Sequence, residues 1–150
     1  MSSNRKLHTL GLIRNQLELE VQAVSAELQK INQLHQNNKK KLQELYDYKS
    51  EYYRDYELIL KNNSQIDLVQ NYQKFVEHLS GIIQQQERNV FLISQELEKV
   101  RVFFIKKLEK KKNFEDHYHR IADEIKMEKE HRQQKNQDRE NSDKYGRGVK

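Results

Sequence analysis

Residues 42–83 read LQELYDYKSEYYRDYELIL, then KNNSQIDLVQ, then NYQKFVEHLSGII, and this stretch decides the fold. Five of the chain's eight tyrosines lie between Tyr46 and Tyr56. A polar break follows, and a second aromatic and apolar group begins at Tyr72. Asn and Ser side chains in the break favour turns, because they hydrogen-bond to nearby backbone groups. The pattern predicts a helical hairpin with its bend near residues 61–71.

The break offers two starts for the helix that follows it. Ser64 followed by Asp67 resembles a capping box in which Asp replaces Glu, so a helix can begin there. Asn71 is an alternative N-cap. We expect a first helix over about residues 5–60 and a second over about residues 65–130, and both starts of the second helix stay open.

Composition favours long helices over a layered globular fold. Hydrophobic residues make up 35% and charged residues 34% of the 150 residues, against usual shares of about 45–50% and about 25%. The chain has no proline, the residue that most strongly interrupts a helix. The run VRVFFI (residues 100–105) has a strand-like composition, but it keeps the helical repeat of its neighbours, so we expect it to be helical.

A heptad repeat of apolar residues runs through both sides of the break. Before the break its first position holds Leu10, Leu17, Val24, Ile31, Asn38, Leu45, Tyr52 and Ile59. After the break it holds Tyr72, Leu79, Gln86, Ile93, Val100, Lys107, Phe114 and Ile121. A second seam position holds Ile13, Val21, Leu28, Leu34, Leu42, Tyr48 and Tyr56 before the break, and Val76, Ile83, Val90, Leu97, Phe104, Lys111, Tyr118 and Ile125 after it. A repeat of this length is typical of a coiled coil, in which a polar residue such as Asn38 can fix the register. We predict an all-α fold, an antiparallel two-helix coiled-coil hairpin with arms of about 50 residues.

The two arms must also be aligned along the seam, the line of side chains where the helices meet. An alignment supported by several apolar pairings places Tyr52 opposite Ile83. The same alignment places Val24 opposite Lys111. Because a lysine fills an apolar seam poorly, we expect the packing to be loose at that level.

The repeat ends after Ile125, so we expect the hairpin to occupy residues 1–125. Residues 126–150 contain only Met127, Tyr145 and Val149 as sizeable apolar side chains. A segment with so little apolar surface cannot pack against a partner helix. We expect a charged tail that frays and then becomes disordered.

Charge and hydropathy restrict the location and the partners of the chain. No apolar run approaches the roughly 20 residues that cross a bilayer, and the N-terminus lacks the pattern of a signal peptide. We therefore expect a soluble, cytoplasmic protein, and docking on a membrane complex stays open at this point. The net charge of +5 favours acidic partners, without pointing to nucleic acid in particular.

The sequence gives no indication of catalysis, a metal or a cofactor. A two-helix seam encloses no pocket, and enzymes need concave, partly dry sites. His117 and His119 are two residues apart, so on a helix they point in different directions. The chain has no cysteine, and it lacks the common zinc-protease and phosphate-binding motifs. We expect a non-enzymatic protein.

Two groups of residues exceed what a two-helix seam requires. Tyr46 and Tyr53 fall outside the seam, and exposed aromatic side chains often anchor protein interfaces. Residues 99–112 hold seven basic residues and one acid. This run is either a solvated helix face or a face for an acidic protein. The hairpin would bring the run to the same end as the basic residues of the N-terminus.

The strings LQELYDYKSEYYRDY and NYQKFVEHLSGIIQQQ resemble the FliJ family, the coiled-coil component of the flagellar type III protein-export apparatus. The matching features are Tyr48 and Tyr52 with Glu51 between them, and the NYQ-x-F string at residues 71–75. The resemblance implies an antiparallel two-helix coiled coil shaped like the central stalk of rotary ATP synthases.

The resemblance also implies partners. In the family, the end that carries both termini enters the ring of the export ATPase FliI. The bend contacts the membrane export-gate protein FlhA, and members also exchange substrate-chaperone complexes with the apparatus. The residues expected to dock on the gate, which we call the tip patch, are Leu45, Tyr48, Tyr52, Phe75, Leu79, Ile82 and Gln86.

We expect the ATPase ring to meet a set of basic residues, which we call the basic set. Its members are Arg5, Lys6, Arg14, Arg101, Lys106, Lys107, Lys110 and Lys111. The chain alone is expected to be monomeric and not to bind nucleic acid. Two alternatives stay open, a structural coiled-coil scaffold and a basic rod that binds nucleic acid. The sequence also leaves open whether the aromatic side chains near the bend fill the seam or form a surface.

Overall fold

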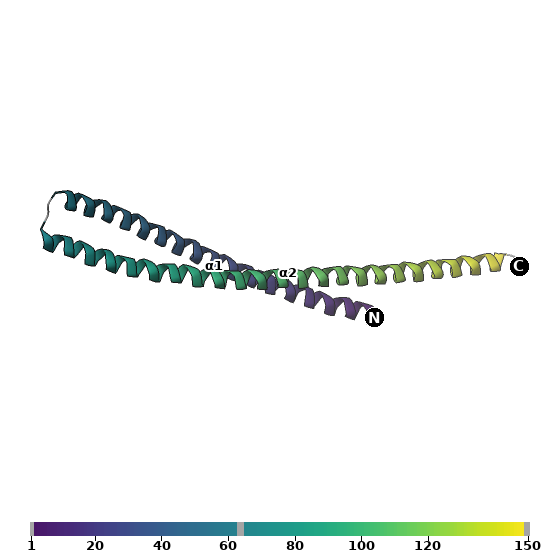
Figure 1. Ribbon diagram of the computed structural model, residues 1–150. Coiled ribbons are helices and arrows are strands. Elements are labelled where there is room, and N and C mark those ends of the chain that lie inside the picture. Colours follow the sequence, from purple (N-terminus) through teal and green to yellow (C-terminus); the bar gives the residue numbers. More distant parts are fainter. Residues whose placement is uncertain (1, 63–64, 149–150) are drawn as a thin grey trace. The chain divides into compact units, whose positions relative to one another are not determined.

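The computed structural model describes residues 2–62 and 65–148, and within them the chain forms two helices (Figure 1). α1 spans Ser2–Lys61 and α2 spans Ile66–Gly148. They run antiparallel, and no strand occurs in the described residues. The predicted all-α two-helix hairpin is confirmed, and residues 100–105 are helical as expected.

The bend between the helices is short. At the end of α1, the backbone amide of Asn62 donates to the carbonyls of Leu58 at 3.2 Å and Ile59 at 3.3 Å. At the start of α2, the carbonyl of Gln65 accepts a hydrogen bond from the amide of Leu68 at 3.1 Å. Backbone groups that lack a partner at a helix end are satisfied in this way.

The start of α2 decides between the two N-caps considered above. Because α2 begins at Ile66, Asn71 lies inside the helix and the alternative that made it the N-cap is wrong. Ser64, the other candidate, lies outside the described residues. Asp67 is in the first turn of α2, where its negative charge complements the helix dipole.

Contacts between the helices divide the hairpin into two units. The base unit comprises Met1–Gln22 and Ile105–Lys150, and the tip unit comprises Ala23–Phe104. The buried side chains in the base unit are Leu17, Val21, Ile121 and Ile125. Those in the tip unit are Val24, Leu79, Ile83, Leu97 and Val100. Every one of them occupies a predicted seam position.

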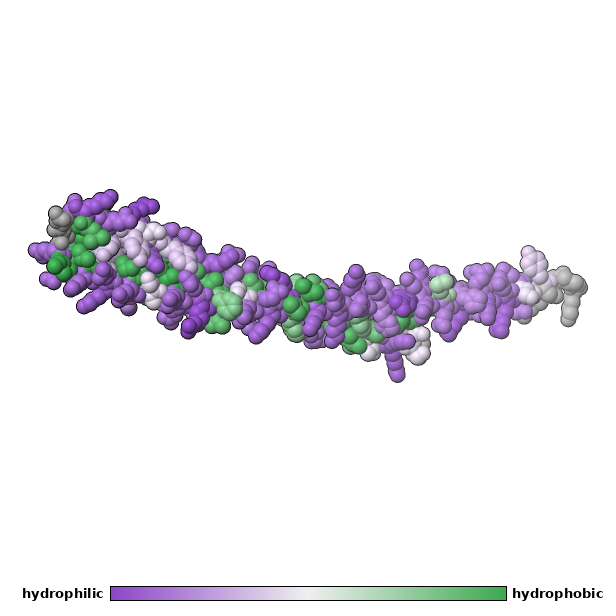
Figure 2. All heavy atoms as spheres, viewed as in Figure 1, coloured by the Kyte–Doolittle hydropathy of each residue, from purple (hydrophilic) through white to green (hydrophobic). Residues whose placement is uncertain are grey.

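The core is narrow in both units. Among the described residues no side chain is fully buried, and no polar or charged residue belongs to the core. Polar residues cover most of the surface visible in Figure 2, where apolar residues appear in separate groups. This is the arrangement expected when each helix buries one stripe against one neighbour.

The predicted alignment of the arms is wrong by about one heptad. Tyr52 stacks on Phe75, with ring centroids 4.2 Å apart, instead of lying opposite Ile83. Lys111 forms an ion pair with Glu18 instead of facing Val24. α1 ends at Lys61 and α2 begins at Ile66, close to the expected bounds, and a bend this short sets each residue of α1 opposite a partner nearer the bend than that alignment placed it.

α2 continues further than expected. It extends to Gly148 instead of ending near residue 130, and residues 126–145 are exposed throughout. In the base unit, Lys129 Nζ donates to Asn4 Oδ1 at 3.4 Å, close to the start of α1. The residues of α2 that follow this contact therefore extend beyond the N-terminal end of α1. A separate tail over residues 126–150 stays a prediction.

Neither α1 nor α2, over the residues that the structure describes, has the combination of length and apolar composition that a membrane span requires.

Candidate docking surfaces

The tip patch is built around aromatic contacts between the two helices. Tyr52 of α1 stacks on Phe75 of α2, and its ring centroid is 4.8 Å from that of Tyr72. The rings of Tyr48 and Phe75 form an edge contact, with centroids 6.3 Å apart, and the centroids of Tyr48 and Tyr52 are 6.0 Å apart. Tilted and edge contacts of this kind add to the stabilisation that comes from buried area. The side chains of the patch are thus held in place by each other.

Exposure divides the tip patch into an inner and an outer part. Leu79 is only 4% exposed, and Leu45, Tyr52 and Phe75 have intermediate exposure. Tyr48 is 47% exposed and Ile82 is 41% exposed. The sequence left open whether residues near the bend fill the seam or form a surface, and the structure shows that some do one and some the other. The inner residues form the seam, and Tyr48 and Ile82 form an accessible edge.

Gln86 contributes to the seam through a polar contact. Its amide Nε2 donates to the backbone carbonyl of Asn38 at 3.0 Å and to Asn38 Oδ1 at 3.1 Å. The side chain of Asn38 donates in turn to the carbonyl of Leu34 at 2.8 Å. Both residues are partly buried, so this pair favours an alignment in which neither amide is left without a partner.

Tyr46 and Tyr53 are 38% and 44% exposed, as expected for positions outside the seam. The hydroxyl of Tyr46 donates to Glu87 Oε1 at 2.7 Å, and this hydrogen bond raises the pKa of Tyr46. The ammonium of Lys49 lies 5.8 Å from the centroid of the Tyr53 ring. Both tyrosines therefore contact neighbouring side chains while keeping part of their surface accessible.

Three members of the basic set form ion pairs between the helices of the base unit. Arg14 Nε donates to Glu115 Oε1 at 2.6 Å, and this hydrogen bond raises the pKa of Arg14 and lowers that of Glu115. Lys107 Nζ lies 3.2 Å from Glu20 Oε2, and Lys111 pairs with Glu18. These hydrogen bonds lower the pKa values of Glu20 and Glu18.

The other members of the basic set differ in position. Arg5, Lys6, Lys106 and Lys110 belong to the base unit and are exposed. Arg101 belongs to the tip unit, where it pairs with Glu98 at 3.1 Å. The base unit therefore contains all members except Arg101.

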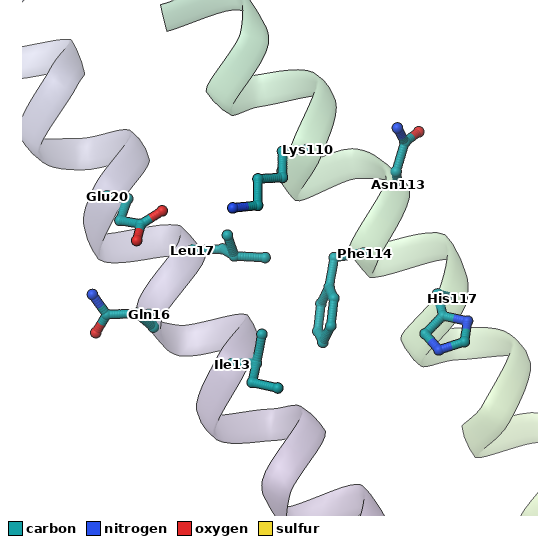
Figure 3. Close-up of a pocket in the computed structure, with 8 residues that line it drawn as sticks. All are labelled: Ile13, Gln16, Leu17, Glu20, Lys110, Asn113, Phe114 and His117. Atoms are coloured by element: carbon teal, nitrogen blue, oxygen red, sulfur yellow. The ribbon is translucent and has the colours of Figure 1, made fainter.

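Sequence reasoning missed a groove between the helices of the base unit (Figure 3). Its volume is about 460 Å³, and Ile13, Leu17 and Phe114 form its apolar part. The remaining lining residues are polar or charged: Gln16, Glu20, Lys110, Asn113 and His117. Ile13 and Phe114 follow the heptad repeat, so the pattern alone assigned both to the seam. Ile13 is in fact 43% exposed, which leaves the groove open to solvent.

Within residues 2–62 and 65–148, no three His, Asp or Glu side chains are grouped so that they could hold a metal ion. His119 instead lies 3.4 Å from Glu115, one turn earlier on α2. That carboxylate also pairs with Arg14, so it already belongs to the contacts between the helices.

Comparison with known proteins gives one finding. The sequence profile of the family described as Flagellar FliJ protein matches residues 6–147. No curated protein and no solved structure gives a significant match. The profile spans nearly all of both helices and includes the tip patch. The chain belongs to the flagellar FliJ protein family.

Proposed function

We propose that this protein is the stalk of the export ATPase ring and an adaptor that connects the ring to the export gate and to substrate chaperones. Family membership makes the chain a component of the flagellar protein-export apparatus. In this proposal the base unit meets the ATPase FliI and the tip patch meets the gate protein FlhA, at the cytoplasmic face of the membrane. The chain acts by binding, as a monomer, and not by catalysis.

The accessible edge of the tip patch carries this proposal. Tyr48 and Ile82 are exposed, yet Tyr48 is fixed by its contacts with Tyr52 and Phe75. A side chain held in position loses little conformational freedom when it binds, which favours affinity. Aromatic side chains of this kind are frequent hot spots of protein interfaces.

The test for the tip is the binding of the full chain to a purified cytoplasmic fragment of the gate protein. Replacing Tyr48 and Ile82 by Ala together should weaken binding at least about tenfold, because interface hot spots contribute more than about 1 kcal/mol each. Tyr46→Ala, a tyrosine outside the patch that is 38% exposed, is the matched control and should leave affinity within about twofold. Equal affinity of the double variant and the parent chain would remove the tip patch from the proposal.

The test for the base separates binding from stability. Arg5, Lys6, Lys106 and Lys110 are exposed, whereas Arg14, Lys107 and Lys111 also stabilise the base unit. Replacing the four exposed residues by Gln should weaken binding to the ATPase, and the loss should be greatest at low salt. Circular dichroism should show unchanged helicity. Full binding by this variant at low salt would contradict the proposed base contact.

A further inference from the structure

The tip unit has a second face that the proposed function does not use. Tyr53 follows Tyr52 by one residue, which turns its side chain by about 100° around α1 and away from the contact of Tyr48 with Phe75. On this side, residues of both helices line a groove of about 390 Å³. Its lining residues are Tyr53, Tyr56, Gln73, Val76 and Glu77.

The lining of this groove combines rings, an apolar side chain and one charge. Tyr53 and Tyr56 contribute aromatic rings, and Val76 contributes an apolar surface. The amide of Gln73 donates to the hydroxyl of Tyr56 at 3.3 Å, so both polar groups have a partner. Glu77 is the one charged residue of the lining, and it is exposed.

This combination suits a cation carried on an aliphatic stem. The stem of an arginine or lysine side chain packs on apolar surface while its charged end stays at the rim. The faces of aromatic rings attract cations, and a carboxylate beside them adds an opposite charge. A carboxylate-bearing side chain would meet Glu77 with the same charge. The groove therefore favours a cation over an anion.

One of the chain's own cations already lies over a ring that lines this groove. Lys49 Nζ lies 5.8 Å from the centroid of the Tyr53 ring. Within residues 42–83, acidic residues also outnumber basic ones, although the whole chain carries a net charge of +5. The acidic residues are Glu44, Asp47, Glu51, Asp55, Glu57, Asp67 and Glu77, and the basic ones are Lys49, Arg54, Lys61 and Lys74.

We propose that this groove, here named the cation groove, is a docking site for an arginine or lysine side chain of a partner polypeptide. In the free protein the ammonium of Lys49 lies over the Tyr53 ring, and the cation of the partner displaces it. The site is distinct from the tip patch, and it does not depend on the proposed function, since its geometry requires neither the ATPase nor the gate.

The test is a nuclear magnetic resonance titration of the isotope-labelled full chain with two blocked pentapeptides, Gly-Leu-Arg-Leu-Gly and Gly-Leu-Glu-Leu-Gly. The Arg peptide should cause saturable shifts at Tyr53, Tyr56 and Glu77, and the Glu peptide should not. Glu77→Gln should weaken binding of the Arg peptide about threefold to tenfold. Lys49→Gln should strengthen it by a similar factor, because a competing cation is removed.

Two control variants separate this site from general charge effects and from the tip patch. Glu57→Gln removes an exposed carboxylate of α1 outside the groove and should change the affinity for the Arg peptide less than about twofold. Tyr48→Ala, in the tip patch, should also leave that affinity unchanged. Because no gate protein is present, this titration and the gate-binding test can fail independently.

Several results would overturn the proposal. Binding of the Glu peptide, with weakening by Lys49→Gln and strengthening by Glu77→Gln, would assign the groove to an anionic partner. Equal binding of both peptides would leave only apolar contact. Shifts centred on Tyr48 and Phe75 would move the binding to the tip patch. Shifts that do not saturate, or that respond equally to Glu57→Gln and Glu77→Gln, would indicate non-specific attraction.

Discussion

The tip unit and the base unit join the same two helices by different interactions. In the tip unit aromatic rings pack against each other between the helices, with the ring centroids of Tyr52 and Phe75 4.2 Å apart. In the base unit ion pairs join the helices, such as Arg14 with Glu115 at 2.6 Å. Contacts between rings depend on buried apolar area, whereas partly exposed ion pairs are weakened by salt and by loss of charge. We therefore expect the stability of the tip unit to depend little on salt concentration and pH, and the stability of the base unit to depend on both.

The largest expected effect comes from removing a ring of the tip unit. Phe75→Ala removes the stacking partner of Tyr52 and the edge contact of Tyr48, and should lower the free energy of unfolding by about 2–3 kcal/mol. Urea denaturation followed by circular dichroism measures this loss, which should be equal in low and high salt. Phe91→Ala is the control, since Phe91 is 59% exposed, and should cost about 0.5 kcal/mol or less. Equal losses in the two variants would contradict the ring-based account of the tip.

A smaller effect is expected when ion pairs of the base unit are removed. Replacing Lys107 and Lys111 by Gln removes the partners of Glu20 and Glu18, and should cost about 1 kcal/mol at low salt. The difference from the parent chain should shrink in 1 M salt, where the Debye length is about 3 Å. Lys112→Gln, an exposed neighbour, serves as control. A loss that is independent of salt would show that the lysine stems, and not their charges, stabilise the unit.

The smallest effect is expected from acid. The pKa values of Glu18, Glu20 and Glu115 are lowered from 4.5 in the folded protein by hydrogen bonds with Lys111, Lys107 and Arg14. A lowered folded-state pKa contributes stability that is present above the unfolded-state pKa and is lost as pH falls through the folded-state value. The base unit should therefore lose stability below about pH 4.5.

Hydrogen exchange at pH 6 and pH 3, corrected for the intrinsic rate at each pH, measures this loss residue by residue. Amides of the base unit should lose more protection than those around Tyr52 and Phe75. Replacing the three glutamates by Gln should abolish most of the pH dependence in the base unit. Equal loss of protection in both units would contradict the comparison between them.

The heptad pattern predicted which residues form the core, but it could not predict their partners. Every buried residue, from Leu17 to Ile125, holds a predicted seam position. A shift of one whole heptad leaves each apolar face opposite the other, so the pattern is equally satisfied by both alignments. The positions at which α1 ends and α2 begins decide between them, and the sequence left two starts of the second helix open.

The ion pairs of the base unit were missed for the same reason. In the predicted alignment Lys111 lies opposite Val24 and appears as a defect of the seam. In the structure it pairs with Glu18, and Lys107 pairs with Glu20. Correct partners for charged residues therefore required the correct alignment of the two arms. The groove at Ile13 and Phe114 was missed because a repeat does not show how completely a seam position is covered.

The sequence separation of the contacting residues sets an order of assembly during synthesis of the protein. Tyr56 and Gln73 are 17 residues apart, whereas Arg14 and Glu115 are 101 apart. Closing the longer loop costs about 1.5 kcal/mol more in chain entropy. At about 5–20 residues per second, the ribosome adds Glu115 about 5–20 s after Arg14. We therefore expect the N-terminal part of α1 to leave the ribosome with its apolar stripe exposed and to need protection from aggregation until the second half of α2 has been made.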